Sequence, residues 1–108
     1  MPPTVESLMS RMPSAFIPEK ARGVDTIMQF HFTGAEPGNW YVVIKDGKLE
    51  VHKGVHPSPK LTLSADSGDY IKVFTGQIDP MQAYMAGKLK LSGDLNLAMK
   101  MMQFFRMN

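Results

Sequence analysis

Apolar residues near the start of the chain recur at three- and four-residue spacing, the period of one face of a helix. This pattern predicts an amphipathic helix over residues 5–12, with Thr4 as its N-cap and Pro13 as its end. Residues 16–23 are predicted to form a short helical turn, because Gly23 suits the position after a helix. The first fifth of the chain is therefore expected to be helical.

Alternation of apolar and polar residues then replaces the helical period and predicts strands, except in residues 40–45, which are apolar on both faces and are expected to be covered on both. The predicted strands are Thr26–Thr33, 40–45, Lys48–Lys53 and 60–65. Asp46-Gly47 is a strong hairpin signal, because a type I′ turn needs residues that tolerate positive φ. The first three strands therefore form an antiparallel meander. Pro57-Ser58-Pro59 interrupts the meander and allows the fourth strand to cross over.

Helical spacing returns after the fourth strand. It predicts a helix over residues 67–75, a helix that begins at Pro80 behind the N-cap Asp79, and a fifth strand over residues 88–92. Strands followed by helices in this order predict an α+β protein with a five-stranded mixed, mainly antiparallel sheet and helices covering one face. A chain of 108 residues has the length of a single domain, so residues 1–108 are expected to form one.

The last predicted helix, residues 95–107 behind the N-cap Asp94, has more apolar surface than one packed face requires. On a helical wheel its apolar positions other than Met107 cover an arc of about 220°, where a surface helix needs about 100°. Asn96, Lys100 and Gln103 share the remaining wedge with Met107. One side of this helix is expected to cover the core and the other to cover a ligand, a partner or a membrane.

Composition narrows the class of protein. The chain has no cysteine, which excludes disulfides and thiol chemistry and is typical of a reducing compartment, so we expect a cytoplasmic location. A net charge of +2 without a basic run argues against nucleic-acid binding. Neither a signal peptide nor a membrane-spanning segment is visible in the sequence. Methionine is the outlier, with ten residues, and its flexible side chain suits adaptable apolar surfaces.

Candidate catalytic chemistry is sparse. No nucleophile elbow, phosphate-binding loop or dinucleotide fingerprint occurs. His52 and His56 lie in a turn segment without clustered carboxylates, so no metal site is predicted. His31 is predicted to point outward from its strand. The combination of little polar chemistry and surplus apolar surface favours a non-catalytic protein without a cofactor that binds an apolar molecule.

Three stretches resemble the sterol carrier protein-2 domain family. They are residues 40–47 (WYVVIKDG), residues 61–66 (LTLSAD) followed by residues 74–76 (FTG) and Asp79-Pro80, and residues 87–100 (GKLKLSGDLNLAMK). Together they cover roughly residues 25–102 in the order that the family has. The resemblance implies a five-stranded sheet with an apolar tunnel between sheet and helices. It also implies binding and intracellular transfer of fatty acids, fatty acyl-CoA, sterols or phospholipids.

The resemblance assigns most of the lipid contacts to residues on the last three predicted helices. Carried over onto this sequence, the residues near the lipid are Phe74, Met81, Tyr84, Met85, Leu95, Met99, Met102 and Phe105. Arg22 stands just before the first strand, where some members use a basic residue to meet the polar head of the lipid.

Two alternative functions stay open at this point. The surplus apolar face of the last helix would also serve a protein–protein interaction or regulatory module, with the chain a monomer or a weak dimer. An enzyme would need a catalytic group in the tunnel, for which the candidates are Tyr70, Tyr84 and His31.

Basic residues near the expected tunnel mouth favour transient contact with an anionic membrane surface. They are Lys88, Lys90, Lys100 and Arg106.

Overall fold

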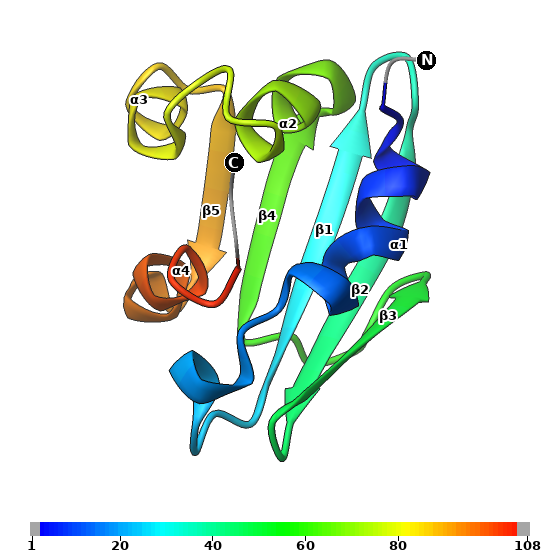
Figure 1. Cartoon of the computed structure of the whole chain (residues 1–108). Helices are drawn as coiled ribbons and strands as arrows, with labels where there is room; N and C mark the ends of the chain where they lie inside the picture. The colour runs from blue at the N-terminus through cyan, green and yellow to red at the C-terminus, as the bar shows by residue number, and fades with distance from the viewer. Residues whose placement is uncertain (1–2, 106–108) are drawn as a thin grey trace.

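A five-stranded sheet in the order β3-β2-β1-β4-β5 forms the centre of the molecule, and the helices lie on one of its faces (Figure 1). The structure is a computed structural model and describes residues 3–105. In chain order the elements are α1 (Val5–Ala15), the 3₁₀ helix η1 (Pro18–Ala21), β1 (Thr26–Thr33), β2 (Gly38–Lys45), β3 (Lys48–Lys53), β4 (Leu61–Asp66), α2 (Ser67–Phe74), α3 (Pro80–Met85), β5 (Leu89–Gly93) and α4 (Leu95–Met101). The predicted α+β class is confirmed.

The sheet is mixed, as predicted. β1, β2 and β3 pair antiparallel as a meander, β4 pairs parallel to β1, and β5 pairs antiparallel to β4. The crossover from β3 to β4 is held by the buried side chain of Gln29. Its Nε2 donates to the carbonyl oxygens of Trp40 and Gly54 at 2.9 and 3.0 Å, and its Oε1 accepts from the backbone N–H of His56 at 2.8 Å. This amide satisfies the loop's polar groups, which allows the loop to pack against the sheet.

The core lies between the sheet and the helices. Alternation along β1 places Met28, Phe30 and Phe32 on the covered face, and all three side chains are buried. Helix α1 covers one end of this face with four buried apolar residues, Val5, Leu8, Met9 and Met12. Figure 1 shows α1 in front of β2 and near β3, whereas α3 and α4 lie near the edge formed by β5. The β3 side of the sheet is therefore covered by the N-terminal helix α1, and the β5 side by the later helices α3 and α4.

Two predicted helix ends were wrong. Helix α1 continues through Pro13 to Ala15. A proline near the end of a helix removes one backbone hydrogen bond and does not prevent the last turn.

Among residues 3–105, no helix has the length and apolar character needed to cross a membrane.

The larger correction concerns the last helix, which ends at Met101 and does not reach Phe105. The backbone N–H of Ile17 donates to the carbonyl oxygen of Phe104 at 2.7 Å, and Phe105 forms an isolated antiparallel bridge with Phe16. These contacts with the N-terminal part replace further helical turns, because they satisfy the backbone and bury aromatic rings together. Arg106 and Met107, also part of the sequence-based predictions, lie outside the described residues.

The end of α4 explains part of the apolar excess seen in the sequence. Leu97 and Met101 of α4, and Phe104 beyond it, are buried in the core. The ring of Phe104 meets that of Phe16 edge to face, with centroids 6.5 Å apart. This flank of the last segment packs on the protein itself and is not a surface for an outside partner.

Candidate functional site

A cavity of about 330 Å³ lies between the sheet and helices α2, α3 and α4. Its lining residues come from every layer of the fold. They are Met12, Met28, Phe30, Leu63, Tyr70, Val73, Phe74, Pro80, Met81, Tyr84, Leu89, Leu91, Leu95, Ala98, Met99, Met101, Met102 and Phe105. The volume is at the lower end of the range of about 300–1,000 Å³ that ligand pockets occupy.

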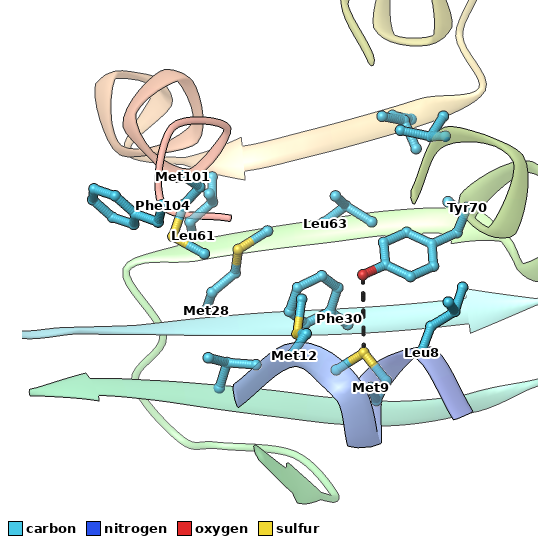
Figure 2. Close-up of a cluster of buried hydrophobic side chains, with 14 of the residues drawn as sticks. Leu8, Met9, Met12, Met28, Phe30, Leu61, Leu63, Tyr70, Met101 and Phe104 are labelled. Atoms are coloured by element: carbon cyan, nitrogen blue, oxygen red, sulfur yellow. Dashed lines mark hydrogen bonds between the residues drawn. The ribbon is translucent and has the colours of Figure 1, made fainter. Parts of the chain in front are cut away.

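The floor of the cavity is the covered face of the sheet. Met28 and Phe30 of β1, Leu63 of β4 and Leu89 of β5 all line it, and all are buried. The register places Phe30 beside Leu63 and Ala65 beside Leu89, so these side chains form a continuous apolar surface across three strands. Figure 2 shows Met28, Phe30 and Leu63 on the same side of the sheet, facing the helices. The sheet therefore provides a rigid apolar wall.

The outer wall is formed by α3 and α4 and is open to solvent. Five of its apolar side chains line the cavity and are nevertheless exposed by 41 to 61%. They are Tyr84, Met81, Met102, Leu95 and Met99, in increasing order. Large apolar groups that are exposed together in this way are typical of a binding surface. Because the same residues face the cavity, this side is its mouth.

Short polar contacts position the two helices that form the mouth. Asp79 and Asp94 cap α3 and α4, and their carboxylates accept from the backbone N–H of Gln82 and Leu97, each at 3.1 Å. The turn from β5 into α4 depends on Gly93, whose φ is +112°. A Cβ at this position would collide with the carbonyl oxygen of Lys60. Glycine is therefore required where α4 folds back over the sheet.

The cavity is almost entirely apolar. Among the lining residues within 3–105, only Tyr70 and Tyr84 carry a polar side-chain group, and none carries a charge. Tyr84 lies at the mouth, whereas Tyr70 is only 4% exposed. Burial raises the pKa of the Tyr70 hydroxyl above its usual range, so this group stays neutral. Such a cavity suits the apolar body of a ligand and offers no compensation for a buried charge.

Seven of the nine residues that the sequence assigned to lipid contact line this cavity: Phe74, Met81, Tyr84, Leu95, Met99, Met102 and Phe105. The other two lie outside its lining. Met85 is the last residue of α3 and is 78% exposed. Arg22 is exposed and follows η1, before the start of β1. The structure therefore brings together seven of the eight predicted apolar residues and leaves Met85 and the charged Arg22 apart.

Sequence reasoning missed the residues at the inner part of the cavity. Met12, Met28, Phe30, Leu63, Leu89 and Leu91 are among these lining residues, whereas Tyr70, which also lines the cavity, was predicted only as a candidate catalytic group in the tunnel. Helical spacing placed Met12 on the apolar face of the first helix, and alternation placed Met28, Phe30 and Leu63 on one face of their strands. That signal does not separate a side chain in contact with another side chain from one that borders a space.

The three histidines lie away from the cavity, on or beside the uncovered face of the sheet. His31 Nδ1 is 2.6 Å from Asn39 Oδ1, the His52 ring stacks on Tyr41, and His56 Nδ1 accepts from the Ser58 N–H at 3.0 Å. Within residues 3–105, no group of three or more His, Cys, Asp or Glu side chains is placed to hold a metal ion. His31 therefore does not reach the cavity as a catalytic group.

Comparison with known protein families gives a match over nearly the whole chain. The model described as the SCP-2 sterol transfer family matches residues 6–106. The curated relatives include hydroxysteroid dehydrogenase-like protein 2 of Xenopus tropicalis, 46% identical over 85 residues, which are 77% of this chain and 20% of that protein. The protein of the same name from Homo sapiens is 32% identical over 82 residues, 74% of this chain and 19% of that protein. The chain thus spans about a fifth of the length of these relatives.

Solved structures share the fold. Sterol carrier protein 2 like 2 (SCP2-L2) from Aedes aegypti has a TM-score of 0.70 and 28% identity, covering 90% of this chain and 88% of that protein. The palmitated form of SCP2L2 from the same organism, solved in solution, has a TM-score of 0.74 and 29% identity over 92% of this chain and 91% of that one. The sec-alkylsulfatase Pisa1 from Pseudomonas sp. has a TM-score of 0.85 over 98% of this chain and 17% of that enzyme, but at 17% identity it shows the fold alone.

Proposed function

Because the chain belongs to the SCP-2 sterol transfer family, we propose that it binds a lipid in the cavity beneath α3 and α4 and transfers it between membranes without catalysis. The proposed ligands are fatty acids, fatty acyl-CoA, sterols or phospholipids. The observation that carries the proposal is the cavity itself, with its wholly apolar floor and its exposed apolar mouth.

The magnitude of the hydrophobic effect supports this function. Transfer of about ten methylene groups from water into the cavity would contribute about 8 kcal/mol, at about 0.8 kcal/mol each. Loss of translational and rotational freedom and ordering of the methionine side chains offset part of this free energy. Micromolar affinity corresponds to about 8 kcal/mol, so affinity in or near that range needs a somewhat longer chain or a ring system.

Two relatives bear on the ligand class. The Aedes aegypti SCP2L2 of the solution structure is palmitated, which supports a fatty acid. The longer relatives are named for hydroxysteroid dehydrogenases, which adds apolar alcohols and ketones as a second class. In both classes we assign contact with the apolar body of the ligand to the seven predicted residues that line the cavity.

Arg22 and Met85 have a different place in the proposal. Since neither residue lines the cavity, contact with them requires part of the ligand to protrude from it. A charged head group outside the cavity would meet this condition. The single lipid-binding domain over residues 1–108 and the cytoplasmic location stay predictions.

The direct test is native mass spectrometry of the gently purified protein, which should show co-purified acyl or sterol species. In parallel, a fluorescent fatty acid should bind and be displaced by unlabelled lipid. The proposal is wrong if neither method detects binding across fatty acids, acyl-CoA and sterols.

An interaction or regulatory module is the second candidate. The exposure of Leu95, Met99 and Met102 on and beside α4 favours it, because an apolar helix face of this kind also suits docking onto another protein. Light scattering at micromolar concentration separates the two functions. A stable dimer without lipid uptake would favour the interaction module, and a monomer that takes up lipid would favour the carrier.

A further inference from the structure

The hydroxyl of Tyr70 is a buried polar group with a poor hydrogen-bond partner. It donates to the Sδ of Met9 at 4.0 Å, the dashed contact in Figure 2. A thioether sulfur is a weak acceptor, and this distance is long even for sulfur. Buried hydroxyl groups usually find an oxygen or nitrogen partner, because leaving one poorly satisfied costs free energy. This O–H is therefore available to a better acceptor.

Aromatic packing holds the Tyr70 ring at the inner wall of the cavity. Its centroid lies 5.8 Å from that of Phe30, 4.8 Å from that of Phe32 and 5.7 Å from that of Phe74. The ring lines the cavity together with Phe30 and Phe74. Rings packed on three sides leave the phenol little freedom, so the position of its oxygen is well defined.

The surroundings of the hydroxyl are able to adjust. Its acceptor Met9 belongs to α1, and Met12, three residues later on the same buried face, lines the cavity. Methionine side chains are unbranched and adopt several conformations at low cost. The Tyr70 oxygen thus contacts Met9, which does not line the cavity but lies on the same buried face of α1 as the lining residue Met12. A small shift of these methionines would let a ligand atom replace the sulfur.

We propose that Tyr70 is the polar subsite at the inner end of the cavity and donates a hydrogen bond to an uncharged oxygen of the bound lipid. The inference rests on the proposed function and specifies its ligand class: lipids whose buried end carries a hydroxyl or keto oxygen. An ionised carboxylate is disfavoured there, because no charged residue of the described part of the chain lines the cavity and an unpaired buried charge is costly. A fatty acid would therefore bind with its carboxylate at the mouth.

The chemical state of the phenol agrees with this role. Burial raises its pKa, so Tyr70 keeps its proton at neutral pH and acts as a donor. Tyr84, the other tyrosine of the cavity, is 41% exposed and reaches water at the mouth. Tyr70 is therefore the lining residue that distinguishes a ligand with a buried oxygen from a plain hydrocarbon. A site that hydrogen-bonds a ligand oxygen rejects analogues that lack it.

The test compares two probes of equal chain length, 1-dodecanol and dodecane, as competitors of a bound fluorescent fatty acid. In the Tyr70→Phe variant the affinity for dodecanol should fall by about 5- to 20-fold, the effect of one lost hydrogen bond in a buried site. The affinity for dodecane should stay within about twofold of that of the unaltered protein, since the phenyl ring keeps its packing. Tyr41→Phe, on the uncovered face of the sheet, controls for the loss of a tyrosine hydroxyl elsewhere.

A measurement on the unaltered protein makes the test independent of the variant's folding. With ¹³C-labelled tyrosine, the Cζ resonance of Tyr70 should shift on addition of dodecanol and not on addition of dodecane. The inference is overturned if that resonance responds equally to both probes, or if Tyr70→Phe binds dodecanol as tightly as the unaltered protein. Equal loss of both probes in the variant would also contradict it, because this would show a packing role only. If the unaltered protein binds neither probe nor any lipid, the proposed function itself fails.

Discussion

The carboxylate of Glu36 accepts a hydrogen bond from the backbone N–H of Val5 at 2.8 Å, across 31 positions of sequence. Its second oxygen accepts from the N–H of Glu6 at 2.9 Å, so one side chain satisfies two free donors at the start of α1. The backbone N–H of Glu36 in turn donates to the hydroxyl of Ser67, the first residue of α2. The loop between β1 and β2 thereby fixes both helices that carry Met12 and Tyr70 into the cavity wall.

Replacement of this carboxylate should loosen α1. In Glu36→Gln only one oxygen remains as acceptor and the negative charge near the helix N-terminus is lost. We expect the free energy of unfolding to fall by about 1–2 kcal/mol, measured by urea denaturation followed by circular dichroism. Glu19→Gln, an exposed carboxylate on η1, should change it by less than about 0.5 kcal/mol. Equal urea midpoints for the two variants would contradict the assignment.

A charge at the mouth of the cavity should prevent lipid uptake without unfolding the protein. Met102 is 43% exposed, so the carboxylate of Met102→Glu reaches water in the empty protein. A bound lipid would cover that carboxylate, which is unfavourable. We expect loss of fluorescent fatty acid binding, with a change in the free energy of unfolding below about 1 kcal/mol.

Two further variants give the comparison for Met102→Glu. Phe30→Glu places the same charge on a side chain that is only 2% exposed and should cost more than about 4 kcal/mol of stability. Val55→Glu changes an equally apolar but 68% exposed residue of the β3–β4 loop, outside the cavity lining, and should leave uptake unchanged. If Met102→Glu is destabilised as much as Phe30→Glu, the Met102 side chain belongs to the core. The assignment of Met102 to the mouth of the cavity would then be wrong.

The buried hydroxyl of Tyr70 should make the protein sensitive to alkali. Its folded-state pKa is raised by burial above the usual value of about 10, so above that pH the unfolded state loses a proton that the folded state keeps. The contribution of Tyr70 to the free energy of unfolding is therefore fully present below about pH 10. It is lost as the pH rises further, by up to about 1.4 kcal/mol per pH unit. Tyr70→Phe should remove this part of the decrease in the free energy of unfolding at alkaline pH. It should leave the free energy of unfolding near pH 8 almost unchanged.

Urea unfolding at about pH 8 and about pH 11 measures the difference. The unaltered protein should lose about 1 kcal/mol more than Tyr70→Phe between the two conditions. Parallel losses in both proteins would show that the phenol ionises alike in the folded and unfolded states, which its burial argues against.

The sheet was predictable because its signals are local. Alternation along Thr26–Thr33 and Lys48–Lys53 and the turn at Asp46-Gly47 each depend on neighbouring residues, and the strands have the predicted bounds. The N-caps Asp79 and Asp94 were also readable, since a cap needs only the next three residues. Local sequence patterns therefore predicted the helices and strands, and the family resemblance predicted how they are arranged.

The end of the chain was not predictable in this way. Phe104 and Phe105 continue the apolar pattern of α4, but their partners Phe16 and Ile17 lie almost ninety residues earlier. Likewise, the apolar pattern marked Met28 and Phe30 as inward-facing without showing that a cavity borders them. Whether a buried side chain meets another or faces a space depends on where α3 and α4 come to lie. That position results from long-range packing and was outside the local signals.

Membrane contact at the mouth should depend on two lysines. Lys88, between α3 and β5, and Lys100, on α4, are exposed, whereas alternation along β5 places Lys90 opposite the inward-facing Leu89 and Leu91. The acidic residues Asp79 and Asp94 of the same helices are occupied as N-caps. Each lysine near an anionic surface contributes about 1 kcal/mol, so Lys88→Glu with Lys100→Glu should weaken binding to phosphatidylserine-containing vesicles by at least tenfold.

Lys48→Glu, on the β2–β3 hairpin, is the matched control and should bind as the unaltered protein does. Added salt should weaken the contact, because the attraction is screened over about 10 Å at 0.1 M salt. Vesicle co-sedimentation that is insensitive to salt and to both substitutions would show that the mouth does not dock through these charges.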